Sequence, residues 1–211
     1  IDGKTAGLGT ISQIIDPGVA IKPDGSEAYL TFGGGDVKGT DLQPGNARIV
    51  KPCKNLASIV IPSSVTSIGD WVFSHCYSLT NIDLPSSITS IGDWAFANCE
   101  VLANIKIPSN VTSLGDRAFF HCYSLTSINI PSSVTKIGNS AFETCTNMTS
   151  IEIPSSVVNI GEKAFYECKN LKIVIDNSEN NLKIGNDAFL DCASVIYTKR
   201  TENPASSTEQ K

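Results

Sequence analysis

A repeat of 23 residues runs through most of the sequence and constrains its fold more than any other feature. Proline, glycine, phenylalanine and cysteine each recur at this step, and only the last unit is one residue longer. The cysteines of the repeat are Cys53, Cys76, Cys99, Cys122, Cys145, Cys168 and Cys192. A period of about 20 to 29 residues is typical of solenoids. One unit buries too few apolar side chains to offset the entropy lost on folding, so the units must stack.

The first part of each unit predicts two short extended segments. Ile105 and Ile107 alternate with polar residues, a period-two pattern that suits a strand. Pro108 ends this strand, because proline lacks the N–H that a continuing ladder needs. Val111 and Leu114 then direct a second extended stretch toward the core. Side by side, the first strands of all units are expected to form a parallel sheet along one face.

The second part of each unit predicts a corner followed by a short helix. Gly115 marks the corner, with either a positive φ or a close backbone approach as the reason for glycine. Asp116 is placed to cap a helix. Ala95, Cys99 and Leu102 of the preceding unit are spaced to lie on one helical face. We therefore expect short helices or turns on the side opposite the sheet.

The repeat divides the chain into three parts. Residues 44–200 form the array, and residues 201–211 form a polar C-terminal tail. Residues 1–43 do not repeat and contain short apolar stretches between glycine and proline turns, which predicts a small β-rich N-terminal cap. The expected fold is an α/β solenoid: a right-handed leucine-rich-repeat array of 23-residue units, with a parallel β-sheet on one face and short helices or turns on the other.

The string I-P-S-S-V-T-S-I-G-D-x-A-F-x-x-C-x-x-L resembles the BspA-like, or treponemal-type, leucine-rich repeat family, and the match covers about residues 53–200. This resemblance implies a bacterial protein that is exported or attached to the cell surface and that adheres to host proteins or to other cells. It implies no shared catalytic residues. The chain begins at Ile1 rather than methionine and no signal-type apolar segment follows, so we expect a processed product whose targeting segment has been removed.

The seven cysteines predict a ladder of free, buried thiols rather than a disulfide framework. Every cysteine takes the same inward position in its unit. Neighbouring coils bring the Cα atoms to about 5 Å, but the Cβ vectors are then parallel, which disfavours a bridge. A zinc site needs convergent ligands such as C-x-x-C, and the sequence has none.

The residues offer no catalytic, cofactor or metal site. His75 and His121 lie two units apart with Asn98 between them, a separation of about 10 Å that is too long for one metal ion. No Ser-His-Asp arrangement recurs, and the triple glycine at 33–35 lacks the lysine and helix pattern of a phosphate loop. The sequence therefore predicts a protein that is not an enzyme and that holds no cofactor.

Charge and hydropathy exclude two further classes of partner. The chain has 16 Lys and Arg against 21 Asp and Glu, and no basic block that would bind nucleic acid. No apolar run reaches the length of about 18 residues that membrane insertion requires.

The first candidate binding surface is the outward side of the first strands. Its column is mixed in charge, as suits a protein partner better than a nucleic acid, although a solvated face without a partner is the alternative. The column is Val60, Asp83, Lys106, Asn129, Glu152 and Ile175. The predicted protein-binding residues on this face are Asn81, Asp83, Asn104, Lys106, Asn129 and Glu152.

The second candidate is an aromatic patch on the helix-bearing edge. Two positions after each glycine the units place Trp71, Trp94 and then Arg117, and Tyr77 and Tyr123 follow the nearby cysteines. Exposed Trp, Tyr and Arg are typical interface anchors, so this patch is predicted to bind a partner or a second copy of the chain. The alternative is that the two tryptophans only cover the short helices.

The leading functional hypothesis is non-catalytic recognition of a protein, such as an extracellular matrix or host surface protein, at a bacterial surface. A structural spacer without its own ligand is one alternative, and a carbohydrate-binding module or an enzyme using residues 1–43 is another. The oligomeric state, the ligand and the binding face stay open.

Overall fold

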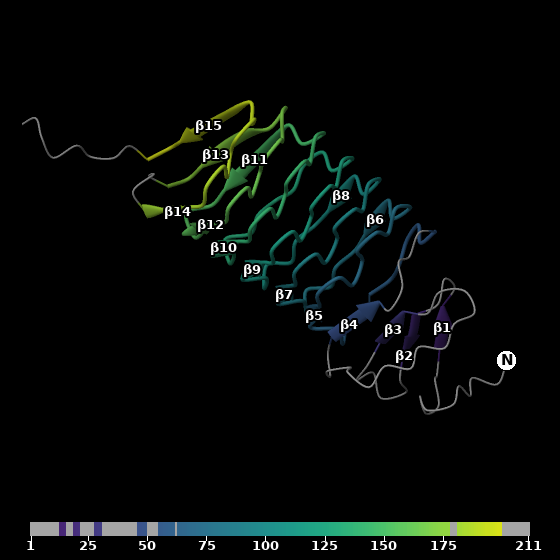
Figure 1. Ribbon diagram of the computed structural model, residues 1–211. Helices are drawn as coiled ribbons and strands as arrows, with labels where there is room; N and C mark the ends of the chain where they lie inside the picture. Colours follow the sequence, from purple (N-terminus) through teal and green to yellow (C-terminus); the bar gives the residue numbers. More distant parts are fainter. Residues whose placement is uncertain are drawn as a thin grey trace, which may run out of the picture.

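The computed structural model describes residues 55–61, 63–177 and 181–199, and, as backbone only, the strands β1 (Gln13–Ile15), β2 (Val19–Ile21), β3 (Ala28–Leu30) and β4 (Asn46–Ile49). The chain winds into coils that stack along one axis (Figure 1). Successive coils repeat at 23 residues, as in the pairing of Ser67 with Ser90. This parallel solenoid confirms the predicted stacking, whereas the right-handed winding remains a prediction.

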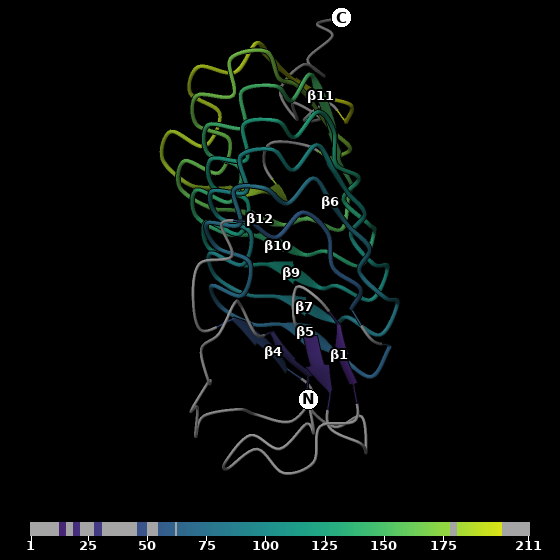
Figure 2. The same ribbon diagram turned by 90° about the vertical axis from the view of Figure 1, so that its right-hand side faces the viewer.

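The longest ladder is built by the second extended segment of each unit (Figure 2). It joins β4 in parallel to β5 (Ser67–Ile68), β7 (Ser90–Ile91), β9 (Ser113–Leu114), β10 (Lys136–Ile137), β12 (Asn159–Ile160) and β14 (Lys183–Ile184). Beyond β4 the sheet continues through β3, β2 and β1, and the β1–β2 and β2–β3 pairs are antiparallel. Whether residues 1–43 cap the core stays a prediction, as do the boundaries of the array, and the tail 201–211 lies outside the described residues.

The first strands form a separate parallel ladder on another side of the coils (Figure 1). This ladder is interrupted, since it is assigned in one group of two strands and one of three. The groups are β6 (Asn81–Ile82) with β8 (Asn104–Ile105), and β11 (Ser150–Ile153) with β13 (Lys172–Ile175) and β15 (Ser194–Tyr197). The prediction of one sheet on one face was therefore too simple: each coil contributes to two ladders.

The third side of each coil consists of turns, and the predicted short helices are absent from the described part of the array. The reason is the backbone at two positions per coil: Trp94 and Asn98 have φ of 57° and 60°, in the left-handed region that interrupts a right-handed helix. Trp94, Phe96 and Asn98 donate their N–H groups to Asp116, Ala118 and Phe120 of the next coil. The turn side is thus held by hydrogen bonds between coils instead of along a helix.

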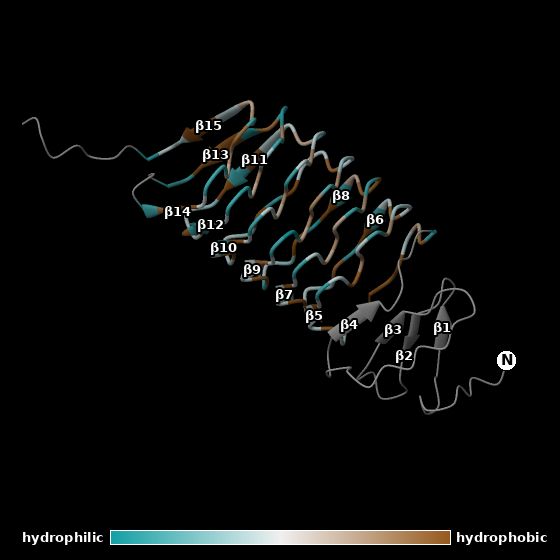
Figure 3. Cartoon of the chain, viewed as in Figure 1, coloured by the Kyte–Doolittle hydropathy of each residue, from teal (hydrophilic) through white to brown (hydrophobic). Residues whose placement is uncertain are grey.

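Equivalent apolar positions of successive coils form one continuous core. Phe73, Phe96, Phe119, Phe142 and Phe165 are fully buried. Their rings stack in sequence with centroids 5.2 to 5.3 Å apart. Polar residues alternate with the apolar ones along each coil (Figure 3). The inward positions predicted from the repeat are therefore confirmed, although turns rather than helices bring them together.

Glycine at the corner is required by close backbone approach. A Cβ atom on Gly138 would lie 2.5 Å from the carbonyl carbon and oxygen of Gly115, and 2.6 Å from the Asp116 nitrogen. Real Cβ atoms do not approach backbone so closely, so no larger residue fits without moving the coils apart. Of the two reasons predicted for glycine, the close approach is the correct one.

Four cysteines form the predicted ladder of buried free thiols: Cys99, Cys122, Cys145 and Cys168. Each thiol donates a hydrogen bond to the carbonyl oxygen of the phenylalanine in the preceding coil, for example from Cys122 Sγ to Phe96 at 3.2 Å. Burial raises the pKa of the Cys99 thiol to about 12. Cys192, in the last coil, is free but only half-buried.

Cys76 corrects the prediction, because it is disulfide-bonded. A coil spacing of about 5 Å falls inside the Cα range that a disulfide spans. The parallel Cβ vectors that disfavour a bridge require the same backbone in both coils. The prediction assumed an unbroken repeat, and the sequence of the unit before Cys76 departs from it, with Val50 in the place of phenylalanine.

The prediction that Ile175 faces outward, at the end of the strand-face column, is also wrong. Ile175 and Ile173 are fully buried, and Val174 lies opposite Glu152 in the ladder. The link between Leu171 and the strand is one residue shorter than in earlier units. Because side chains alternate between the two faces of a strand, a shift of one residue exchanges inward and outward positions.

In the part of the chain described, the structure has no helix with the length and apolar character needed to span a membrane.

Candidate functional site

The strand face carries the first group of predicted binding residues. Asn81, Asp83, Asn104, Lys106, Asn129 and Glu152 are all exposed. Asn81 lies beside Asn104 in the ladder, and Asn104 bridges to Ser127. The structure therefore brings these residues to one face, as predicted, and none of the six side chains is aromatic.

The turn side carries the second group and shows a denser arrangement. The rings of Trp71 and Trp94 stack with centroids 4.5 Å apart and planes only 9° from parallel. The guanidinium carbon of Arg117 lies 4.7 Å from the Trp94 ring centroid, a cation–π distance. All three residues occupy the same left-handed backbone position of successive coils, with φ from 55° to 63°. This shared position aligns their side chains in one column.

Phe120 extends the stack and was not predicted from the sequence. Its ring lies 5.6 Å from that of Trp94 and 3.7 Å from that of His121. His121 in turn lies 5.2 Å from Tyr123. These ring contacts form one continuous series, which we call the aromatic edge: Trp71, Trp94, Phe120, His121 and Tyr123. The doublet Phe119-Phe120 is the signal that could have revealed it, since the first ring belongs to the core and leaves the second on the surface.

Tyr77 belongs to a smaller cluster, in the same repeat unit as Trp71 and two units before Tyr123. Its ring meets the His75 ring edge-on at 5.7 Å. The His75 Nε2 atom lies 3.3 Å from the amide nitrogen of Asn98, and its Nδ1 atom lies 2.8 Å from the Ser74 hydroxyl. The two histidines are thus held by separate neighbours. In the part of the chain described, no group of three His, Cys, Asp or Glu side chains could hold a metal ion.

The charge of His121 is set by its place in the aromatic edge. Burial lowers the pKa of the imidazole, and the carboxylates of Glu143, Glu100 and Glu167 oppose this shift. Because the pKa falls below its ordinary value, the ring is neutral at pH 7 and behaves as part of the aromatic surface.

A ladder of acidic and amide side chains runs beside the tryptophans. The carboxylate of Asp93 accepts the backbone N–H of Asp116 at 2.7 Å, and Asp116 accepts that of Asn139 at 2.9 Å. The side chain of Asn139 accepts the N–H of Glu162 at 2.9 Å. The predicted helix cap is therefore wrong: these side chains cap the turn of the next coil.

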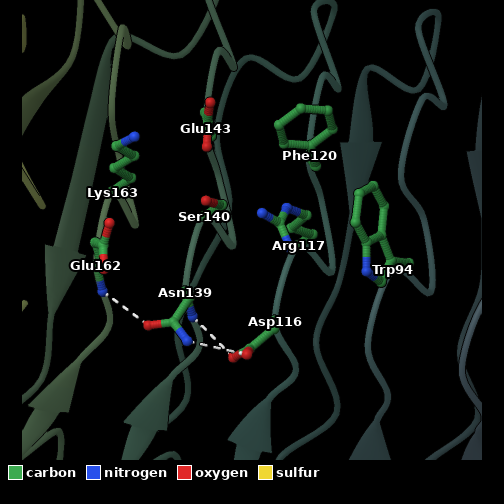
Figure 4. Close-up of a pocket in the computed structure, with 9 residues that line it drawn as sticks. All are labelled: Trp94, Asp116, Arg117, Phe120, Asn139, Ser140, Glu143, Glu162 and Lys163. Atoms are coloured by element: carbon green, nitrogen blue, oxygen red, sulfur yellow. Dashed lines mark hydrogen bonds between the residues drawn. The ribbon is translucent and has the colours of Figure 1, made fainter.

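A pocket of about 460 Å³ opens at the end of the tryptophan stack (Figure 4). It lies over Ser140, which occupies the same column position as Trp94, Arg117 and Lys163 in neighbouring coils. Ser140 is small where its neighbours are long, and this difference creates the hollow. The pocket is lined by Trp94, Asp116, Arg117, Phe120, Asn139, Ser140, Glu143, Glu162 and Lys163.

The pocket combines both signs of charge with an aromatic wall. Arg117 and Lys163 stand on opposite sides of Ser140, and Trp94 and Phe120 close one end (Figure 4). Asn139 bridges part of the floor, since its amide nitrogen donates to Asp116 at 3.0 Å. This arrangement suits binding of a side chain or small polar group.

Stacked coils of constant length, parallel ladders between them and a core of repeated apolar positions define a leucine-rich-repeat solenoid. The model of the BspA type leucine rich repeat region matches in six copies over residues 48–148 and 113–206. The chain therefore belongs to this family. Proteins of this repeat class generally take part in protein interactions or lie at cell surfaces, and they are typically not enzymes.

Solved structures of bacterial leucine-rich repeat proteins are similar to the chain. A leucine-rich repeat protein from Bacteroides ovatus is 29% identical, with a TM-score of 0.53 over 67% of this chain and 43% of that protein. The chain thus spans less than half of that relative. The T. pallidum leucine rich repeat protein TpLRR is 24% identical, with a TM-score of 0.58 over 85% of this chain and 81% of that one.

The pneumococcal vaccine antigen PcpA is 19% identical, with a TM-score of 0.53 over 86% of this chain and 46% of PcpA. At such identities TpLRR and PcpA support the fold alone. No curated protein shows a significant match to the chain.

Proposed function

We propose that the chain is a non-catalytic protein-binding module of a secreted or surface-attached bacterial protein, and that the aromatic edge together with Arg117 forms its contact surface. The single observation behind this proposal is the stack of Trp71, Trp94 and Arg117 on the outside of the coils. Trp71 is 49% exposed although its side chain is large and hydrophobic. Rigid, exposed Trp, Tyr and Arg side chains are the residues that dominate binding energy at protein interfaces.

The alternative, in which the two tryptophans only cover short helices, has less support. The short helices that they were to cover are absent from the described coils. A side chain that only covers others would itself be mostly buried on the covering side and little exposed, whereas Trp71 is an exposed large side chain. The ring stack therefore contributes surface more than core.

Secretion and adhesion are part of the same proposal. The family to which the chain belongs supports a location outside the cell. Matrix and host surface proteins are then the partners to test first.

The test is a binding array of extracellular matrix proteins, host receptor ectodomains and glycans, probed with the whole chain. A protein that binds is measured again with Trp71→Ala/Trp94→Ala. We expect a loss of at least about tenfold, because truncating interface anchors typically costs 2 kcal/mol or more. The matched control is Asn104→Ala/Lys106→Ala on the strand face, which should bind like the unchanged chain.

The alternatives predict other outcomes. Equal binding by the tryptophan variant, with loss in the strand-face variant, moves the contact to the first ladder. A glycan as the only ligand favours the carbohydrate-binding alternative. Absence of any ligand favours the structural spacer.

A further inference from the structure

We propose that the pocket over Ser140 receives a neutral aromatic side chain with a hydrogen-bond donor, such as tyrosine, from the partner protein. This inference rests on the proposed protein-binding function and specifies the chemistry that the partner presents. It rests on the short side chain of Ser140, which leaves a vacancy in the column of longer side chains, and on the charged residues around that vacancy.

The vacancy has the dimensions of one stacked ring. Along the column, Trp71 and Trp94 lie 4.5 Å apart and Arg117 lies 4.7 Å from Trp94, so one planar group occupies each coil. Ser140 interrupts this series and is itself buried, with Arg117 before it and Lys163 after it. These two residues are two coils apart, or about 10 Å. A ring at the level of Ser140 would lie about 5 Å from each of them.

Of the two flanking cations, Arg117 favours an aromatic face most directly. The guanidinium of Arg117 stacks on Trp94 with one side and turns the other toward Ser140 (Figure 4). A cation within about 6 Å of a ring centroid is attracted to the ring's negative face. A ring inserted here would be attracted by Arg117 from one side. The Lys163 ammonium on the other side lies 5.7 Å from the Tyr166 ring centroid, so the inserted ring would share this cation with Tyr166.

The surrounding carboxylates select against charged ligands. Asp116, Glu143 and Glu162 line the same pocket and would repel a phosphate or a carboxylate. Arg117 and Lys163 would repel an ammonium or guanidinium group. A neutral ring avoids both penalties.

The donor requirement comes from Glu143 and Glu162. In the part of the chain described, neither carboxylate is used in a side-chain hydrogen bond or an ion pair with Arg117 or Lys163. A phenol O–H inside the pocket would donate to one of them, and a charged acceptor makes such a bond strong. Phenylalanine offers the same ring without this donor and should bind more weakly.

The pocket can be filled from within the chain. Ser140 has φ of 53°, close to the 57° of Trp94, so the backbone at this position accepts a large side chain. In Ser140→Trp the new indole should continue the stack and occupy the vacancy. Ser140→Ala keeps the pocket open and serves as the matched control.

The experiment titrates the isotope-labelled whole chain with N-acetyl-tyrosinamide and follows amide shifts by NMR. We expect millimolar binding, with shifts centred on Arg117, Ser140 and Lys163, in the unchanged chain and in Ser140→Ala. The unchanged chain should bind N-acetyl-phenylalaninamide at least about fivefold more weakly. Ser140→Trp should bind N-acetyl-tyrosinamide at least about fivefold more weakly, and its spectrum should remain that of a folded protein. Acetate and methylammonium should produce no shifts at these residues.

Shifts elsewhere, equal binding by Ser140→Trp, or a stronger response to acetate or methylammonium would overturn the inference. Its failure is separable from that of the proposed function. If a protein partner binds Ser140→Trp as tightly as the unchanged chain but does not bind the tryptophan double variant, the aromatic edge is the contact and the pocket is not.

Discussion

At the scale of single residues, the cysteine position shows how one side chain can serve both the core and the backbone. Each buried thiol fills a small space beside the phenylalanine stack and donates to a carbonyl oxygen of the preceding coil, at 3.0 Å from Cys168 to Phe142. Valine would fill a similar space but could not donate. Serine could donate but would bring a more strongly solvated hydroxyl into an apolar core.

Thiol labelling checks this arrangement directly. When the native chain is treated with iodoacetamide at about pH 8, Cys192 should be modified first, because it is only half-buried. Cys99, Cys122, Cys145 and Cys168 should stay unmodified until the chain is denatured, since all four are inaccessible. Mass spectrometry of the peptides locates the labels. Rapid modification of the four buried thiols in the native chain would contradict the structure.

The same thiols make stability depend on alkaline pH. Burial raises the pKa of Cys99 and Cys168 to about 12 from an ordinary value of 9.0, so the folded chain keeps protons that the unfolded chain releases. Their contribution is complete below about pH 9 and is lost as the pH rises toward 12. Urea denaturation at rising pH should show the free energy of unfolding falling above pH 9. A Cys99→Ala/Cys168→Ala variant should show a shallower fall, and an equal fall would assign the effect to other groups.

At the scale of the element, the turn is stabilised by its neighbour more than by itself. Two left-handed residues per coil prevent a helix, and N–H groups on this side point to the next coil. The acidic ladder adds a side-chain acceptor for each following turn, as Asp70 does for Asp93 at 2.8 Å. An isolated turn would lose all of these bonds.

Substitution at Asp93 measures the contribution of one such cap. Asp93→Ala removes the acceptor of the Asp116 N–H and should lower the free energy of unfolding by about 1 kcal/mol. Asp93→Asn should retain most of the stability, because Asn139 performs the same role one coil further on. Chemical denaturation of both variants gives the comparison. A loss in the asparagine variant as large as in the alanine variant would show that charge, and not the hydrogen bond, is responsible.

At the scale of the whole molecule, each coil contacts mainly its two neighbours, so stability is close to a sum over adjacent pairs. The pairing of equivalent residues at 23-residue intervals means that any coil fits on any other along the regular array. The chain should therefore tolerate changes in coil number far better than changes in coil length.

Deletion of residues 116–138 tests this expectation. The deletion joins Gly115 to Asn139 and removes one complete coil, so the remaining ladders stay in register. Circular dichroism should show retained β structure and cooperative thermal unfolding with a modest decrease in Tm. Deletion of residues 116–137 is the control, and its one-residue shift should strongly destabilise the fold. Equal behaviour of the two deletions would contradict the stacked register.

The sequence predicted the stacking and the core because equivalent positions recur in every unit. The positions of Phe119 and Cys122, for example, are buried in each regular coil. It failed at the turns because apolar spacing such as that of Ala95 and Cys99 fits a helical face, while the left-handed backbone at Trp94 leaves no mark in the residue type. The sequence predicted that Trp71 and Trp94 lie together on one edge, and their rings do stack, while their role in binding stays a prediction. The pocket escaped prediction because Ser140 gains meaning only from the size of its neighbours across coils.

The direction of the hydrogen bonds has a mechanical consequence. Along the turns, N–H groups such as that of Trp71 donate to the next coil, and on the ladders N–H groups such as that of Thr89 donate to the preceding coil, so these bonds run along the axis of the stack. A pull on the two ends would load them one after another, and the coils would peel away singly instead of resisting together. If such a solenoid is attached at one end and a ligand holds the other, it would lengthen in steps under flow. This lengthening would absorb tension before the ligand dissociates.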